Sequence, residues 1–455
     1  MLFSLNLNND RNFSQNTDTI QNNILKNILF ISRLIVMRNI WTIISLGLGG
    51  LSVLSSAHAT TGYFMHGYGV KAQGQAGATI AQFNDALTIA NNPSGLVWLD
   101  SRIDLGATVF KPERTATIQD NQFGANGHYD GNGREYFVLP EWAINKKVND
   151  QVALGLAIYG NGGMNTSYKQ NPFSAFGNTG TAGVNLSQVF ISPAVAWRYA
   201  DNQSIGLAAN FLYQRFEAKG IQGFAPFSSD PQYLSDQGTD SSKGVGFRVG
   251  WSGRLNDQIT LGLNYSSKIN ADRFDKYRGL FAQSGDFDVP ESYGLGVNIQ
   301  ATPKLNIAAD VQRINYSDVD AVGNRFSLSA LQAGHLFGSE QGPGFGWDDI
   351  NIYKIGASYQ LAPQFTVRAG YSYNDQPISK DQTFLNILAP GVIQHHVSVG
   401  ATWQIDPKQE LNIAYTYGVK HKLKGDQSIP AAFGGGHADL EMDQHILGLS
   451  YGIKF

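Results

Sequence analysis

The sequence predicts an all-β protein, a 14-stranded antiparallel transmembrane β-barrel with an N-terminal hatch (plug) inside its lumen. Three observations predict this fold: segments in which apolar side chains alternate with small or polar ones, tight turns that alternate with long polar connections, and an amphipathic strand that ends the chain at Phe455. Alternation with period two places successive side chains on opposite faces of a strand, as a barrel between lipid and lumen requires.

The composition agrees with many short strands. The 455 residues include 51 Gly, 20 Tyr, 26 Phe and 7 Trp, which is too aromatic for a disordered chain, while the mean hydropathy is below zero, which is too low for a bundle of membrane helices. The sequence has no cysteine, which argues against a thiol enzyme, a Cys-ligated zinc site and a disulfide framework. Its net charge of −3 gives no support for a nucleic-acid partner.

The N-terminus has the pattern of a secretory signal. An apolar run, Ile40–Leu54, follows Arg38 and precedes Ala57-His58-Ala59, the small-x-small form that signal peptidase accepts. We therefore expect residues 37–59 to be a cleaved signal peptide, and residues 1–36 to be an upstream extension that is not native. The alternative is a retained membrane anchor, for which the apolar run is short.

Strand-like alternation begins after Ser101, and the barrel is expected to span residues 101–455. In four segments an aliphatic face that ends in aromatic residues alternates with a face of small and polar residues: 103–110, 152–159, 259–266 and 411–418. A soluble β-sandwich also alternates, so this pattern alone does not establish a membrane protein.

The lengths of the connections separate the two possibilities. Six tight turns contain Asn, Asp or Pro and lie at 148–150, 200–202, 256–257, 301–304, 361–364 and 406–408. Seven long loops are expected at 111–133, 160–186, 218–242, 270–288, 316–349, 375–392 and 422–439. Six turns and seven loops require fourteen strands, an even number, with both ends of the barrel on the periplasmic side. Closing the sheet removes edges that lipid would not tolerate.

The last strand has the clearest alternation. Its apolar face consists of Leu447, Leu449, Tyr451, Ile453 and Phe455, while small and polar residues lie between them. A terminal Phe preceded by such a face resembles the signal that the outer-membrane assembly machinery reads, so this machinery is an expected partner. The alternative is an ordinary edge strand that happens to end at Phe455.

Residues 60–100 do not alternate. Their closely spaced Gly and Ala residues suit compact turns and short helices that pack against another surface. A wide barrel is an open aqueous pore unless its lumen is filled, so we expect this segment to be the hatch. The alternative is a flexible periplasmic tail, against which the apolar content of the segment argues; its larger apolar residues are Phe64, Met65, Phe83, Leu87, Ile89, Leu96, Val97 and Trp98.

In this segment the chain resembles the FadL family of outer-membrane fatty-acid and hydrocarbon transporters, which includes TodX-like channels. The resemblance rests on Gly62-Tyr63-Phe64, Gly74-Gln75-Ala76-Gly77-Ala78, Asn84-Asp85-Ala86 and Asn91-Asn92-Pro93-Ser94-Gly95-Leu96. The family usually has Asn-Pro-Ala where this chain has Asn92-Pro93-Ser94. Hatch-motif residues carried over from the family are therefore Gly74, Gly77, Asn92 and Pro93.

The resemblance implies a passive channel in the outer membrane of a Gram-negative bacterium, for long-chain fatty acids or hydrocarbons. It implies capture among extracellular loops, an inner pocket contacted by Phe64, Met65 and Tyr68, and sideways release at a kinked third strand. Outer-membrane lipid and lipopolysaccharide are expected partners of a monomeric barrel. Two alternatives are a porin-like channel for polar solutes, which needs an open lumen, and a surface adhesin or receptor, for which the long loops would suffice.

Two prolines lie inside predicted strands. Pro140 and Pro193 cannot donate to a β-ladder, and they flank the predicted third strand. We expect them to loosen pairing around residues 150–160, with help from Gly160 and Gly162, and so to permit a lateral opening. The alternative is that both prolines mark tolerated bulges unrelated to transport.

Apolar clusters in long loops are candidates for the capture site. Phe173 and Phe176 lie in the second loop, Phe224 and Phe227 in the third, and the fifth contains Phe326, Leu328, Leu331, Leu336 and Phe337. A mostly apolar concave site suits a small hydrophobic ligand. The alternative is that these residues only pack the loops together.

No catalytic, metal or cofactor site is expected. His395 and His396 are adjacent in a predicted strand, so their rings point to opposite faces and cannot bind one ion together. Ser and His residues show no spacing that marks an esterase or phospholipase, and no phosphate-binding loop is present to couple transport to ATP. The protein is therefore not expected to be an enzyme.

Overall fold

The computed structural model describes residues 61–455. The expected upstream extension, the expected signal peptide and the first residue of the expected hatch lie outside these residues.

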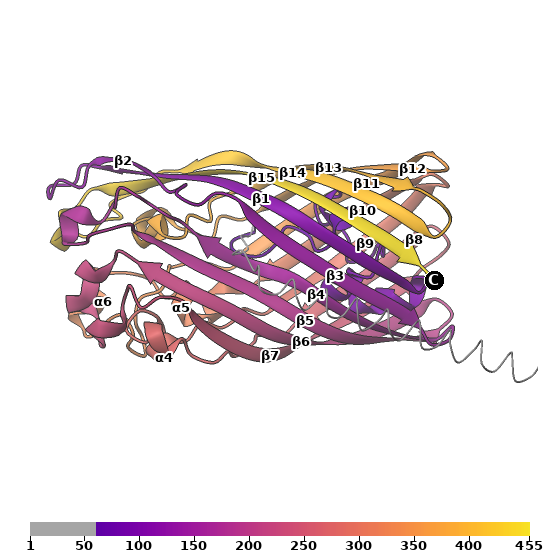
Figure 1. Ribbon diagram of the computed structural model, residues 1–455, viewed down its shortest axis with the longest axis horizontal. Coiled ribbons are helices and arrows are strands. Elements are labelled where there is room, and N and C mark those ends of the chain that lie inside the picture. The colour runs from indigo at the N-terminus through magenta and orange to yellow at the C-terminus, as the bar shows by residue number, and fades with distance from the viewer. Residues whose placement is uncertain (1–60) are drawn as a thin grey trace, which may run out of the picture. The chain divides into compact units, whose positions relative to one another are not determined.

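The described chain forms a closed antiparallel barrel of fourteen strands, as the sequence predicted (Figure 1). Consecutive strands pair with each other, and the last strand pairs with the first to close the sheet. A fifteenth, short strand, β2, pairs only with β1 and lies in the first long loop. The strands are β1 (Arg102–Gln119), β2 (Gly127–Asp130), β3 (Phe137–Lys147), β4 (Val152–Asn165), β5 (Gly183–Ala200), β6 (Gln203–Lys219), β7 (Asp240–Arg254), β8 (Ile259–Ser266), β9 (Ser292–Thr302), β10 (Leu305–Ile314), β11 (Ile350–Ala362), β12 (Phe365–Asn374), β13 (His395–Gln404), β14 (Gln409–Leu423) and β15 (His437–Lys454).

The alternation of tight turns and long loops is confirmed, but several expected loop bounds are wrong. The first loop was expected to begin at residue 111, whereas β1 continues to Gln119 because its polar outward residues extend the ladder with β15. The second was expected to begin at residue 160, whereas β4 continues to Asn165. The last loop is likewise shorter than expected and occupies 424–436. Polar outward-facing side chains mark the point at which a strand leaves the lipid. The main-chain hydrogen bonds of the ladder continue beyond that point.

Short helices occur in the hatch and in the loops. The hatch contains α2 (Val70–Gln73), α3 (Thr88–Asn91) and η2 (Pro93–Trp98). The loops contain η3 (Ser174–Phe176), η4 (Gln222–Phe227), η5 (Pro231–Tyr233), η6 (Asp275–Tyr277), α4 (Ala282–Gly285), η7 (Tyr316–Asp318), α5 (Asp320–Gly323), α6 (Leu328–Gln332), η8 (Lys380–Gln382), η9 (Leu385–Ile387) and η10 (Ala431–Phe433). None of the helices in residues 61–455 is long and apolar enough to cross a membrane.

The two faces of the barrel wall differ as the sequence predicted. On β15, Leu447 and Leu449 are about half exposed on the outer face, whereas Gln444 and Ser450 are buried on the inner face. Apolar side chains on the outer face contact lipid at no cost, while polar groups on the inner face need partners within the lumen.

The hatch, residues 61–100, supplies many of those partners. Its residues contact inward-facing groups of the strands, and most of them are buried. Lumen glycines allow this close approach: a Cβ on Gly250 would lie 1.9 Å from Asn92 Oδ1, and one on Gly206 would lie 2.3 Å from the Pro93 carbonyl carbon. Gly74 approaches Gly400 in the same way, with 3.1 Å between a Gly74 Cβ and the Gly400 Cα. These glycines let the hatch main chain contact the wall directly.

Candidate functional site: hatch, inner pocket and interrupted ladder

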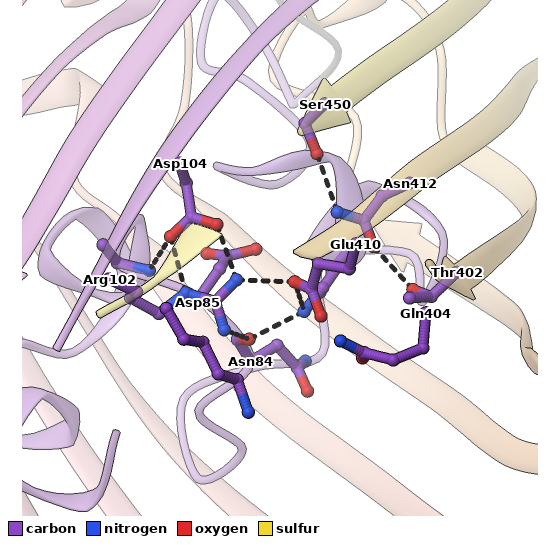
Figure 2. A network of polar contacts seen from close by, with 12 residues as sticks. Asn84, Asp85, Arg102, Asp104, Thr402, Gln404, Glu410, Asn412 and Ser450 are labelled. Atoms are coloured by element: carbon purple, nitrogen blue, oxygen red, sulfur yellow. Dashed lines mark hydrogen bonds and ion pairs between the residues drawn. The ribbon is translucent and has the colours of Figure 1, made fainter. Parts of the chain in front are cut away.

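A buried charge network fixes the hatch to the barrel wall (Figure 2). Lys71 of the hatch forms an ion pair with Glu410 of β14, and Arg102 of β1 contacts the same carboxylate at 2.5 Å and Asp104 at 2.6 Å. All four side chains are at least nine-tenths buried. Asp104 also accepts a hydrogen bond from the Ala86 main-chain N–H at 2.8 Å. Charges removed from water are tolerated only when paired and hydrogen-bonded, and each charge in this group has such partners.

The neighbouring carboxyl of Asp85 belongs to the same network. Burial, and then the nearby Asp104, raise the pKa of Asp85 to about 6. Its Oδ1 accepts the Leu87 N–H at 3.1 Å and so orders the turn into α3. The wall strand between β1 and β14 contributes Gly452, where a Cβ would lie 2.7 Å from both the Arg102 Nη2 and the Asp104 Oδ1. Gly452 therefore leaves the space that the charges occupy.

The Asn92-Pro93-Ser94 motif makes a second attachment. Asn92 Nδ2 donates to the carbonyls of Ile80, at 2.7 Å, and Trp251, at 3.1 Å, and Asn92 Oδ1 accepts from both the main-chain N–H and the hydroxyl of Ser94. Pro93 begins η2, where its missing N–H costs nothing. Gly77, a motif residue elsewhere in the hatch, has a φ of +75°, a backbone conformation that favours glycine.

The three hatch residues expected to contact substrate line one cavity. Phe64, Met65 and Tyr68 face β7–β11 of the wall across a space bounded also by Ile80, Asn91, Asn264, Gln312 and Ile314. About 490 Å³ between these atoms is empty, part of it open to solvent. We refer to this space as the inner pocket.

Two cations that the sequence analysis missed, Arg248 and Lys354, also line the inner pocket. Arg248 donates to Tyr159 Oη and Ser266 Oγ, both at 3.0 Å, and none of the ion pairs in the described chain includes it. Lys354 Nζ donates to the His66 carbonyl and to Gln312 Oε1, both at 3.3 Å. The signal in the sequence was a charged residue on the lumen face of a strand whose other lumen-facing residues are small. This signal could be used only once the pairing register of the strands was known, because the register brings these residues to one pocket.

The β3–β4 ladder is interrupted beside the hatch. β3 pairs with β1 from Phe137 to Asn145, but with β4 only as far as the Trp142–Ile158 pair. Beyond this pair, Asn161–Asn165 of β4 are buried on both faces, and Gly162 pairs with Phe64 of the hatch. A Cβ on Gly162 would lie 1.9 Å from the Tyr63 carbonyl oxygen. β4 therefore turns inward, and the hatch replaces β3 as its partner.

The two prolines differ in their relation to this interruption. Pro140 of β3 pairs with Ala107 of β1 and lies just beyond the last β3–β4 pair. Pro193 pairs with Leu156, and the β4–β5 ladder continues past it as far as Asn165–Asn185. The expectation that both prolines loosen β4 around residues 150–160 is therefore wrong for Pro193. The pairing that Pro193 lacks is with β6, on its other side. The β4–β5 ladder has a register shift between Gly160 and Gly162.

Above the interruption, the strands are rejoined by side chains and loop main chain. Gly133 N–H donates to the Ser167 carbonyl and Ser167 N–H to that of Gly131, both at 2.9 Å. Arg114 of β1 donates to the carbonyls of Asn165 and Arg134, each at 2.6 Å. The interruption therefore has a lower border of paired strands and an upper border of loop contacts.

The predicted loop phenylalanines come together, but they are packed rather than exposed. Phe173 is fully buried and Phe224 nearly so, and Phe176 and Phe227 are half-buried. Ring centroids lie 5.5 Å apart for Phe173–Phe224 and 5.3 Å apart for Phe227–Phe433. Five loops contribute to this loop phenylalanine cluster, which consists of Phe173, Phe176, Phe224, Phe227, Phe326, Phe337, Phe384 and Phe433.

An apolar cavity adjoins this cluster. It is bounded by Phe224 and Phe337 of the cluster and, among others, by Phe216, Leu280 and Leu385, and about 500 Å³ within it is empty, part of it open to solvent. The sequence analysis did not name Phe384 and Phe433, which lie in the sixth and seventh long loops. The cluster and the cavity together give the loops an apolar interior.

The adjacent histidines do point to opposite faces. His395 lies on the outer face, where its Nδ1 is 2.7 Å from Tyr371 Oη, and His396 is fully buried on the inner face. Among residues 61–455, no three His, Cys, Asp or Glu side chains are positioned to hold one metal ion.

Comparison with known proteins adds family evidence. Over 386 residues the chain is 23% identical to outer membrane protein P1 of Haemophilus influenzae, covering 73% of this chain and 80% of that one. Over 392 residues it is 22% identical to the long-chain fatty acid transport protein of Escherichia coli O6:H1, covering 77% and 84%. The crystal structure of the Pseudomonas putida toluene transporter TodX has the same fold, with a TM-score of 0.65 at 18% identity, covering 87% of this chain and all of that one.

Residues 51–455 match the family model described as outer membrane protein transport protein (OMPP1/FadL/TodX). The chain therefore belongs to this family of outer-membrane transport proteins, which are not enzymes, and it is a protein of the Gram-negative outer membrane.

Proposed function

We propose that this protein is a passive channel that takes hydrophobic small molecules from the cell exterior and releases them sideways into the membrane. The observation that carries the proposal is the interruption of the β3–β4 ladder beside the hatch-lined inner pocket. A hatch that fills the lumen blocks the axial route, so a route through the wall is the shorter path for an apolar solute. Transfer of apolar surface from water into lipid supplies the driving force.

Three spaces lie along the proposed path. The apolar cavity beside the loop phenylalanine cluster is suited to capture, with Phe173, Phe176, Phe224 and Phe227 supporting its walls. A smaller space between Gly62, Met164, Trp347 and Met442 lies between the loops and the interrupted ladder. The inner pocket follows, where Phe64, Met65 and Tyr68 would contact the substrate.

The chemistry of the inner pocket favours a substrate with an anionic head. Arg248 is buried with neutral hydrogen-bond partners, and Lys354 adds a second positive charge to a pocket that Phe64 and Ile314 also line. A carboxylate would pair with the guanidinium while its hydrocarbon part contacts the apolar walls. Among the relatives, one is named a long-chain fatty acid transport protein and one a toluene transporter, so both substrate types are open to test.

Uptake of radiolabelled oleate and toluene into cells with and without the gene tests the proposal. We expect the gene to raise oleate uptake, and the Arg248→Met variant to reduce oleate uptake several-fold while leaving toluene uptake unchanged. Arg254→Met is the matched control, because Arg254 lies over the Trp98 ring at the turn end of the barrel. Gene-dependent uptake of sugars instead of either hydrophobic compound would overturn the proposal in favour of a porin-like channel.

A further inference from the structure

Two histidine rings in contact join the hatch to β13, a wall strand that four other strands separate from β4. The rings of His66, in the hatch, and His396, on β13, have centroids 4.6 Å apart, and their planes meet at 34°. Both side chains are buried, with 1% and 0% exposure. Ser372 Oγ of β12 lies 3.4 Å from Nδ1 of each ring, so one hydroxyl bridges the two imidazoles.

The hydrogen bonds of the pair suit neutral rings. Gln444 Nε2 donates to His396 Nε2 at 2.9 Å, which requires an unprotonated nitrogen there. His66 Nε2 is buried without a hydrogen-bond partner. A protonated His66 would therefore bury an N–H without an acceptor, and a protonated His396 would lose its bond from Gln444 unless that amide turned over.

The charges around the pair also oppose protonation. Lys354 of β11 faces His66 and donates to its carbonyl, and His395 precedes His396 on β13. Asp310 of β10 is the acidic group on the far side of Lys354, and it is engaged by the Thr79 and Ile80 N–H groups at 2.7 and 3.0 Å. Within residues 61–455, neither His66 nor His396 forms an ion pair with a carboxylate. Burial, and then the neighbouring His396 and Lys354, lower the pKa of His66 well below its ordinary value.

The hatch segment that carries His66 is the one that pairs with β4. Met65 N–H donates to the Asn161 carbonyl at 3.0 Å, and Gly163 N–H donates to the Tyr63 carbonyl at 2.9 Å. β14, β15, β1 and β3 lie between β13 and β4 around the barrel. Only three positions therefore separate His66 from Tyr63, whose carbonyl Gly163 contacts at the border of the interrupted ladder.

We infer that the His66–His396 pair is an acid-sensitive contact that holds the hatch closed while both imidazoles are neutral and releases it when either is protonated. The direction follows from linkage. The imidazole is harder to protonate in the closed state than in an opened, hydrated state. Opening is therefore favoured as the pH falls below the ordinary pKa of imidazole. Each pKa unit between the two states changes the ratio of open to closed hatch about tenfold.

This inference deepens the proposed function, because it concerns how the same hatch is regulated, but its test does not need a hydrophobic substrate. The purified full-length barrel is inserted into planar lipid bilayers, and ion conductance is recorded at about pH 7.5 and about pH 4.5, on either side of the ordinary imidazole pKa. We expect the fraction of time spent in a conducting state to rise at least about tenfold on acidification. His66→Gln and His396→Gln should each abolish most of that rise.

Two further variants make the test specific. His128→Gln is the matched control, because His128 is exposed on β2 in the first long loop, where its Nδ1 lies 3.0 Å from Thr117 Oγ1, and the acid response of this variant should equal that of the unmodified protein. His396→Lys places a fixed charge in the pair and should conduct at about pH 7.5 as the unmodified protein does in acid. Heat-modifiable migration on gels confirms that each variant has assembled.

The results separate this inference from the proposed function. An acid response that is absent, or that persists unchanged in both glutamine variants, overturns the inference. Oleate uptake at neutral pH in the same strains would then still support the channel. If oleate uptake is absent while conductance responds to acid through His66 and His396, the acid-sensitive contact is supported and the proposed substrate class is rejected.

Discussion

Lys71 of the hatch and Glu410 of β14 form an ion pair that is buried within the lumen, and Arg102 shares the same carboxylate. Replacing Glu410 by Gln leaves two buried cations with one remaining acidic contact. We expect the hatch attachment to weaken by about 3–5 kcal/mol. Hydrogen exchange of hatch amides, measured by mass spectrometry, should accelerate accordingly. Glu113→Gln is the control, because it removes an exposed partner of Lys111; a surface ion pair contributes little to stability, so exchange of the hatch amides should stay as in the unmodified protein.

Gly162 lets the hatch pair with β4. A valine side chain there would meet the Tyr63 carbonyl, so Gly162→Val should displace hatch residues 61–65 from the strand. We expect hydrophobic uptake to fall several-fold while the barrel still assembles. Ala107→Val, on the membrane-facing side of β1, controls for added bulk. Unchanged uptake in Gly162→Val would show that this pairing has no part in transport.

Pro140 lies at the border of the interrupted ladder, whereas Pro193 lies within a continuous β4–β5 ladder. Pro140→Thr supplies a main-chain N–H and allows the β3–β4 ladder to lengthen. We therefore expect uptake to decrease in Pro140→Thr and to stay the same in Pro193→Thr, with equal assembly of both. A loss of uptake in Pro193→Thr alone would contradict the proposed exit.

Phe433 contacts five rings of the loop phenylalanine cluster, those of Phe176, Phe224, Phe227, Phe326 and Phe384. Phe433→Ala should destabilise the packed loops by about 3–5 kcal/mol. We expect faster protease cleavage in the loops and weaker binding of a fluorescent fatty-acid analogue. Phe247→Ala, on the outer face of β7, should leave both unchanged. Tight ligand binding with rapidly cleaved loops would mean that the cluster does not shape the capture site.

The loop between β8 and β9 should respond to pH through Asp286. Burial, together with the adjacent Asp288, raises the pKa of Asp286 from 3.8 to about 6. A carboxyl with a raised pKa stabilises the closed loop fully below its ordinary pKa, and this contribution is lost as the pH rises through about 6. Exchange of amides 267–291, corrected for intrinsic rates, should therefore be slower at about pH 4 than at about pH 7. Asp286→Asn should remove the difference.

The sequence was sufficient to predict the barrel because local patterns encode it directly. Side-chain alternation gave the faces of strands such as β15, and Asn, Asp and Pro gave the turns. Strand ends were less predictable: Lys111 and Glu113 look like loop residues, yet they continue the β1–β15 ladder outside the lipid. Hydrogen bonding does not require apolar side chains, so polarity could not reveal where β1 ends.

The residues of the inner pocket could be predicted only where they are neighbours in sequence. Phe64, Met65 and Tyr68 are close in sequence and share the inner pocket. Arg248 and Lys354 join that pocket from strands far apart in sequence, which no local pattern encodes. His66 and His396 are separated by 330 positions in the numbering, and their contact depends on barrel closure. The Pro193 prediction failed because a strand has a neighbour on each side. The sequence does not show toward which neighbour the missing main-chain N–H of a proline would point.

The pairing of β1 with β15 sets the order in which the molecule can be built. Every residue of both strands, Arg102–Gln119 and His437–Lys454, joins this seam, so the cylinder can be sealed only after the whole polypeptide has been made. The hatch precedes β1 and must already be enclosed at that moment. Arg102 of β1 and Glu410 of β14 lie on the two strands that flank β15, and both belong to the hatch network, so this network is complete only when β1 pairs with β15.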